Sequence, residues 1–186
     1  MTKILIAYYS LTGYTRALAE LLAEQSGDGA RLLEIVPVKP YTYFSAGVKG
    51  VTQAMTGTIV ELSSAVPETG GFDALVVLSP TWGWMSSPPV RSFVAGLPEG
   101  DGRPAVAGVT HAGGPIGSFE RLAGLVAERG YNVVRTLSVF CYDREAMAGA
   151  ARDAATAIAA AEGPVAGGAA SQEHAAERPA GGEAAS

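Results

Sequence analysis

Short apolar runs recur along the chain and are separated by segments in which polar and apolar positions alternate with helical spacing. The runs are Lys3–Tyr9, Leu32–Val36, Ala74–Ser79, Ala105–Thr110 and Val133–Phe140. The first, third and fourth are almost continuous in Val, Ile, Leu and Ala, as strands that are covered on both faces must be. The pattern predicts five β-strands, three of them fully buried.

The segments between the runs place apolar residues three or four positions apart. Leucines at positions 18, 21 and 22 lie on one side of a helix predicted over Thr15–Glu24, and Phe119–Arg129 repeats this spacing. Glu145–Ala161 is rich in alanine and also predicts a helix. Strands that alternate with helices indicate right-handed βαβ units. The sequence therefore predicts an α/β fold, with a doubly wound parallel sheet of five strands and helices on both faces.

One connection is longer than this alternation requires. Pro37–Gly57 contains three aromatic residues, Tyr41, Tyr43 and Phe44, and we expect a short helix near Ala46–Met55. The aromatic side chains are expected to cover the edge of the sheet, and lining a pocket is the alternative.

Composition and charge bear on the number of domains, the partners and the location of the protein. The 186 residues are 48% apolar and 17% charged, which fits one globular domain over residues 1–162. Residues 163–186 contain almost no large apolar side chain and are predicted to be a disordered tail. The net charge of −5 argues against nucleic acid as a partner. No apolar run is long enough to span a membrane and no signal peptide is evident, so a cytoplasmic location is expected. Cys141, the only cysteine, is expected to be a core residue.

The loop after the first predicted strand carries more hydroxyl groups than a turn requires. It consists of Ser10, Leu11, Thr12, Gly13, Tyr14 and Thr15. The start of a helix offers unpaired N–H groups and a partial positive charge, and hydroxyl groups add further donors. The loop therefore predicts an anion site, with a capped turn as the alternative. It matches neither the GxxxxGK[ST] loop nor the GxGxxG loop of nucleotide-binding proteins.

The loop after the third strand is aromatic. Its candidate residues are Pro80, Thr81, Trp82, Gly83 and Trp84. Two tryptophans around a glycine favour a planar aromatic ligand, whereas a single tryptophan at the end of a strand more often covers the core.

The loop after the fourth strand is rich in small residues, most of them glycine. Its candidate residues are Thr110, His111, Ala112, Gly113, Gly114 and Gly117. Such residues allow backbone N–H groups to approach the edge of a ligand. His111 either contacts that ligand or is merely exposed. In an open parallel sheet these three loops meet at one edge, so they predict a site for a flat heterocycle that carries a phosphate.

These motifs resemble those of the flavodoxin family. SLTGYT resembles its phosphate loop, Pro80–Gly83 its first flavin loop, and the glycine-rich stretch from Thr110 its second flavin loop. The resemblance extends over about Lys3–Ala161 in motif order, and the uninterrupted fifth strand resembles the short-chain form. It implies the strand order 2-1-3-4-5 and FMN bound without a covalent link.

The resemblance also implies roles for individual residues. The hydroxyl and N–H groups of Ser10–Thr15 would hold the phosphate. The flavin ring would rest on Trp82, with Thr81, Gly83 and Trp84 along its edge. The carbonyl group of Gly83 would be able to turn toward protonated flavin N5, because glycine adopts the required conformations without penalty.

Two departures from the family pattern bear on function. Tyr14 replaces the usual asparagine, and the second flavin loop lacks an acidic residue and a stacking tyrosine, which leaves one flavin face open. The leading hypothesis is an electron carrier between an NAD(P)H-dependent reductase and an acceptor protein. The alternative is an NAD(P)H-dependent reductase of quinones or similar aromatic compounds. The strand ends lack the acidic cluster of a phospho-receiver domain, which shares this topology, so that class is discounted.

Overall fold

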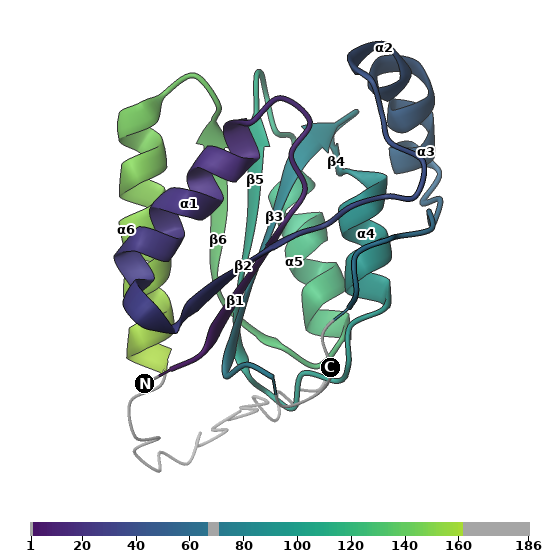
Figure 1. Ribbon diagram of the computed structural model, residues 1–186. Coiled ribbons are helices and arrows are strands. Elements are labelled where there is room, and N and C mark those ends of the chain that lie inside the picture. The colour runs from purple at the N-terminus through teal and green to yellow at the C-terminus, as the bar shows by residue number, and fades with distance from the viewer. Residues whose placement is uncertain (1, 67–70, 162–186) are drawn as a thin grey trace, which may run out of the picture.

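Five parallel strands form the centre of the molecule in the computed structural model, which describes residues 2–66 and 71–161 (Figure 1). They are β1 (Ile4–Tyr8), β2 (Ala30–Glu34), β3 (Ala74–Trp82), β5 (Pro104–His111) and β6 (Asn132–Phe140). Their order across the sheet is β2-β1-β3-β5-β6. Numbered among themselves along the chain, the five strands have the order 2-1-3-4-5, which confirms the predicted topology. The predicted tail, residues 163–186, lies outside the described residues.

A sixth, very short strand departs from the prediction. β4 (Met85–Ser86) pairs antiparallel with the end of β3, which continues three residues beyond the predicted end at Ser79. The two residues between the paired strands, Gly83 and Trp84, have φ values of 55° and 62°. Positive φ at both positions is typical of the type I′ turn that closes two-residue hairpins. The aromatic loop is therefore a tight β-hairpin.

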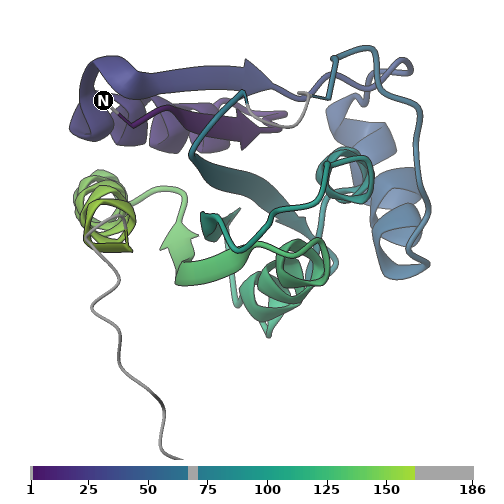
Figure 2. The ribbon, with the colours of Figure 1, turned by 90° about the horizontal axis from the view of Figure 1, so that it is seen from below.

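Helices cover both faces of the sheet, as predicted (Figure 2). α1 (Tyr14–Ser26) and α6 (Arg144–Ala161) lie on one face, and α4 (Pro88–Ala95) and α5 (Ser118–Glu128) on the other. A 3₁₀ turn, Gly27–Gly29, follows α1. The apolar spacing does not predict α4, because it begins with two prolines and reads as a loop. Proline is nevertheless well suited to the first position of a helix, where no intrahelical donor is needed.

Side chains along each central strand alternate between two apolar layers. On β1, Ile6 packs in one layer with Leu18 of α1, and Leu5 packs in the other with Phe93 of α4. All of these side chains are at most 4% exposed. The alternation follows from the two-residue period of a strand, and the continuous apolar runs reflect burial on both faces.

The long connection after β2 forms a helical stretch at the same end of the sheet as the start of α1 (Figure 1). It consists of α2 (Tyr43–Ser45), the π-helical segment Ala46–Gly50 and α3 (Val51–Met55). The sequence predicts a helix only from Ala46. The earlier start is explained by a capping box, in which the Ser45 N–H donates to Thr42 Oγ1 at 3.2 Å and the Thr42 N–H donates to Ser45 Oγ at 2.8 Å. None of the helices in the described residues is long and apolar enough to span a membrane.

Candidate functional site

A pocket of about 340 Å³ lies where the loops after β1, β3 and β5 come together. The structure brings residues of all three predicted loops into its lining. These are Leu11, Thr12, Tyr14, Thr15, Pro80, Thr81, Trp82, Gly83, Thr110, His111 and Ala112. The carboxyl ends of neighbouring parallel strands thus meet in one cavity, as the topology requires.

Some predicted residues lie outside the lining, and some lining residues were not predicted. Those outside the lining are Ser10, Gly13, Trp84, Gly113, Gly114 and Gly117. The lining residues that the sequence did not predict are Ala46, Gly47, Val51, Cys141 and Tyr142. Tyr43, for which lining a pocket was the alternative to covering the edge of the sheet, also belongs to the lining. Cys141 and Tyr142 follow β6, whose carboxyl end lies at the same edge of the sheet as the three predicted loops. The position of this strand would have been enough to add the loop after it to the predicted site. The aromatic residues of the long connection were the corresponding signal for Tyr43.

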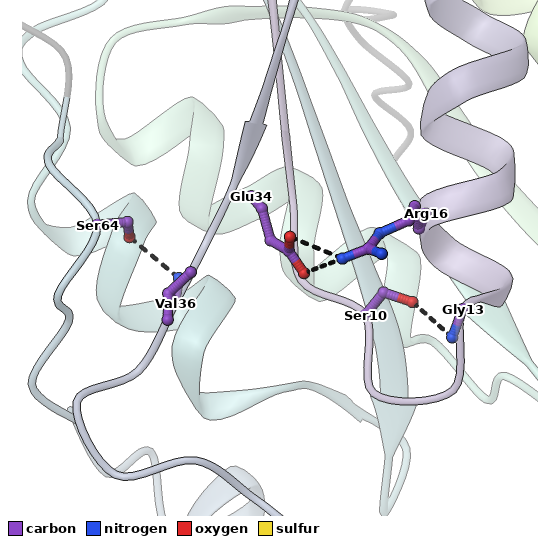
Figure 3. Close-up of polar contacts among 6 residues, drawn as sticks. All are labelled: Ser10, Gly13, Arg16, Glu34, Val36 and Ser64. Carbon is purple, nitrogen blue, oxygen red and sulfur yellow. Dashed lines mark hydrogen bonds and ion pairs between the residues drawn. The ribbon is translucent and has the colours of Figure 1, made fainter.

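The N-terminus of α1 is open toward solvent and carries no side-chain cap. Gly13 precedes the helix with a φ of 91°, and the first turn contains no acidic residue. A Cβ atom at Gly13 would have no other atom within 4 Å. Ser10 Oγ accepts a hydrogen bond from the Gly13 N–H at 3.1 Å and so closes the loop (Figure 3). The first N–H groups of α1 therefore have no side-chain cap, which suits the binding of a phosphate group.

The two threonines of the first loop differ in their surroundings. The hydroxyl group of Thr15 lies 2.8 Å from that of Thr110, and both side chains are buried. Thr12 is exposed, and its side chain has no hydrogen bond to another described residue. A hydroxyl group can take part in more than one hydrogen bond, so Thr15 still has capacity for a ligand.

No Asp, Glu, Lys or Arg side chain is among the described residues that line the pocket. The nearest cation in sequence, Arg16, turns away and pairs with Glu34 of β2, with its Nη2 at 2.6 and 2.7 Å from the two carboxylate oxygens (Figure 3). The hydrogen bond to Glu34 raises the pKa of Arg16. The donors available to an anion are thus neutral N–H and hydroxyl groups.

Trp82 forms an aromatic wall that belongs to both the pocket and the core. The residue is 9% exposed, and its ring packs edge-on against Tyr9 and Tyr41, with centroid distances of 5.7 and 5.0 Å. A Cβ atom at Gly50 would lie 2.7 Å from its Cζ3, so the π-helical backbone touches the ring. Burial, with smaller contributions from Tyr41 and Glu34, raises the pKa of Tyr9 to about 12. Both interpretations of Trp82, the core lid and the ligand wall, are compatible with this position.

The hairpin is held to the third loop through α5. The hydroxyl group of Thr81 lies 3.2 Å from that of Ser118. Arg121 Nη1 donates to the carbonyl oxygens of Trp84 at 3.2 Å and Ile116 at 3.0 Å. Sequence reasoning missed Arg121, because an arginine on an amphipathic helix gives no signal of its partners. Arg121 thus ties the turn of the hairpin to the end of the third loop.

The wall of the pocket at the ends of β5 and β6 contains a polar atom that has no hydrogen-bond partner among the described residues. Nδ1 of His111 is buried and has no hydrogen-bond partner among the described residues. Cys141 is 7% exposed, as expected for a core residue, and burial raises the pKa of its thiol. Tyr142 is 62% exposed and packs edge-on against Tyr14 at 5.2 Å. A buried nitrogen without a partner is costly, so a ligand that hydrogen-bonds to His111 would offset that cost.

Comparison with solved structures identifies proteins of similar architecture. A flavoprotein in complex with FMN from Lactobacillus acidophilus NCFM matches with a TM-score of 0.60 and 18% identity, over 74% of this chain and 93% of that one. A flavodoxin from the domain Archaea matches with a TM-score of 0.57 and 15% identity, over 85% and 97%. The chain has a flavodoxin-like fold. An NADH:FMN oxidoreductase (EMOB) in its apo form also shares this fold, with a TM-score of 0.58 and 15% identity, over 86% and 90%.

At these identities the likeness concerns the flavodoxin-like fold and not the activity. No family model and no curated protein matches the sequence. In the described part of the chain, no group of three or more His, Cys, Asp and Glu side chains is placed to hold a metal ion.

Proposed function

We propose that this protein binds FMN non-covalently in the pocket between the three loops and serves as an electron-transfer protein. The observation that carries this proposal is the convergence of an uncapped helix N-terminus, a tryptophan wall and residues 110–112 on one pocket. The shared fold with a flavoprotein that was solved in complex with FMN supports it.

The donor set fits a phosphate monoester joined to a flat ring. The free N–H groups at the start of α1, together with the hydroxyl of Thr12, would hold the phosphate. Trp82 would form the wall for the ring system, and the backbone of residues 110–112 would follow its edge. The bound flavin supplies the ability to accept and release electrons, while the protein sets its position and surroundings.

Exposed apolar side chains on the loops around the pocket support a protein partner. Phe44 is 82% exposed, Ile116 62% and Trp84 52%. Exposed large apolar side chains near a cofactor are typical of an interaction site. We infer that an NAD(P)H-dependent reductase and an acceptor protein dock here, in the cytoplasm, and exchange electrons with the bound flavin.

A reductase of small aromatic compounds is the second candidate. Tyr43 is 82% exposed and lines the pocket, so it is able to contact a substrate that stacks on the flavin. A protein of the same fold is an NADH:FMN oxidoreductase. Anaerobic addition of NADH or NADPH to the purified FMN-loaded protein separates the two candidates. An electron carrier keeps its yellow colour until a reductase is added, whereas the enzyme is bleached by the nicotinamide cofactor alone.

The cofactor assignment is tested by releasing the flavin. We expect the purified protein to be yellow and the heat-released cofactor to migrate with FMN in chromatography. The reason is that the first pocket offers one anion site, at the start of α1, which matches one phosphate group. FAD as the main species would contradict the proposal. A colourless protein that does not bind added FMN in a fluorescence titration would also contradict it.

A further inference from the structure

A second cavity of about 300 Å³ lies on the other side of the helical stretch 43–55. Ser45, Lys49 and Gln53 recur every four residues along that stretch and line this cavity. Ala46, Gly47 and Val51 line the first pocket instead. The two cavities therefore lie on different faces of one helical segment, and this second one takes no part in the proposed flavin site.

The charge of the second cavity is unusual for this chain. Lys3, Lys39 and Lys49 are the only lysines of a protein with a net charge of −5, and two of the three line this cavity. Neither Lys39 nor Lys49 forms an ion pair with a described residue, although Glu61 is also in the lining. Two ammonium groups gathered at one cavity favour an anionic ligand over a cationic or neutral one.

The wall opposite the helix is fixed before any ligand binds. Pro37 is buried and forms an isolated bridge with Leu62. The Val38 N–H donates to the Glu61 carbonyl oxygen at 2.9 Å, and the Val36 N–H donates to Ser64 Oγ at 3.1 Å (Figure 3). Pro37 and Pro40 further restrict the backbone of this wall. The backbone of this wall therefore needs little ordering on binding, and preorganisation of this kind favours affinity.

A polar donor also points to a ligand with acceptor oxygens. The Tyr41 hydroxyl donates to Gln53 Oε1 at 2.7 Å, so the amide nitrogen of Gln53 keeps both of its N–H donors. The lining thus combines two ammonium groups and a carboxamide donor with one carboxylate, that of Glu61, and keeps a net positive charge. Phosphate and carboxylate groups are the acceptors that such a set matches.

We propose that the cavity between the helical stretch 43–55 and residues 37–40 and 60–61 is a binding site for a small dianion that carries phosphate or carboxylate groups, with Lys39 and Lys49 as its principal ligands. Tyr41 lines this cavity and also packs against Trp82 of the first pocket. Tyr41 therefore connects the second cavity to the aromatic wall of the first. The proposal holds whether or not the first pocket binds FMN.

The test is a titration followed by ¹⁵N-resolved backbone amide shifts of the full-length protein, with inorganic pyrophosphate in one arm and succinate in the other. Saturable shifts are expected at residues 39, 41, 49 and 53 with at least one anion, weakening as salt is added. A variant with both Lys39→Gln and Lys49→Gln should bind at least about tenfold more weakly. Lys3→Gln, which removes the remaining lysine at the opposite end of β1, is the matched control and should bind like the parent protein.

The outcomes separate this proposal from the flavin assignment. In the FMN-loaded protein the first loop is occupied, so shifts at residues 10–15 are not expected. In the apoprotein, binding at the first loop moves Gly13, whereas binding at the second cavity moves Lys49. Linear shifts without saturation for both anions would overturn the proposal. Parental affinity of the double lysine variant, with an unchanged melting temperature, would overturn it as well.

Discussion

The hydroxyl groups of Thr15 and Thr110 meet at 2.8 Å, although 95 positions separate the two residues in the chain. Both side chains are almost fully buried, with 2% and 3% of their surface exposed. This contact joins the first loop of the pocket to the third. The two loops are therefore held in register by the fold and not by a ligand alone.

The contact should be visible in a double-mutant cycle on the apoprotein. Thr15→Val removes one hydroxyl with little change of shape and leaves the hydroxyl of Thr110 buried without its partner, so the free energy of unfolding should fall by about 1–3 kcal/mol. Adding Thr110→Val should cost much less than the same change alone. Thr15→Ser keeps the hydroxyl and is the control. Strictly additive effects in urea denaturation would show that the pair contributes nothing.

A set of glycine variants should separate backbone strain from steric clash. Gly113→Ala is expected to be almost neutral, because a Cβ atom there meets nothing within 4 Å. Gly13→Ala meets no atom either, but its φ of 91° should cost about 1 kcal/mol of stability. Gly83→Ala should cost more, because it adds a contact of 2.7 Å with Val51 Cγ1 to a φ of 55°. Adding Val51→Ala to Gly83→Ala should recover the part of that cost that comes from the steric clash.

Thermal melts of the four apoprotein variants make this comparison. Equal losses for Gly13→Ala and Gly83→Ala would mean that Val51 moves away freely. The same geometry bears on the idea that Gly83 is needed for its carbonyl group to turn toward the flavin. A valine at this position would clash and would not test that idea alone, so the paired variant with Val51→Ala is required.

Cys141 offers a direct readout of the first pocket. Burial raises the pKa of its thiol, so little thiolate exists near neutral pH. A thiol-specific reagent should therefore label Cys141 of the apoprotein slowly. Saturation with FMN should slow it further, because Cys141 lines the pocket that the cofactor would fill. As the only cysteine, it gives a single kinetic phase. Riboflavin, which lacks the phosphate, is the control and should protect less at equal concentration. Labelling rates that do not respond to FMN would place the cofactor elsewhere.

Tyr9 should make the fold sensitive to alkali. Burial holds the pKa of Tyr9 at about 12, against 10.0 for an ordinary tyrosine, with smaller contributions from Tyr41 and Glu34. Between these values the unfolded chain has lost a proton that the folded chain keeps, so stability present below pH 10 is lost as the pH rises toward about 12. Tyr9→Phe should flatten this part of the stability profile. Tyr43→Phe, at an 82% exposed ring, should leave it unchanged. Chemical denaturation at a series of pH values measures both slopes.

The apolar pattern was sufficient for the five parallel strands because strands buried on both faces tolerate few polar residues. It failed where a polar or proline-containing stretch is held by its neighbours. β3 continues through Pro80, which pairs in register with Thr110 even though proline has no N–H to donate. The hairpin beyond it depends on positive φ at Trp84, a conformation that a sequence with tryptophan in that position does not suggest.

The candidate site was predictable only in part for a related reason. Loops that follow strands of a parallel sheet are placed by the topology, and residues from all three reached the pocket. Tyr43 and Val51 come from a connection whose course the topology does not determine. Their positions depend on tertiary packing, namely of Tyr41 on Trp82 and of Gly50 against the same ring. The sequence also left open whether the Trp82 side chain faces the core or a ligand, because its direction depends on the same packing.

The π-helical segment Ala46–Gly50 lets the long connection carry one residue more than an α-helix of the same course. Five π-helical residues turn the chain about as far as four α-helical ones, so Tyr43 and Val51 reach one pocket together, and Ser45 and Gln53 reach the other. Deleting the exposed Val48 would allow the stretch to return to α-helical geometry with both pairs of residues still on shared faces. The loss of a single codon at this point of the connection is thus expected to leave both cavities and every strand of the sheet in place.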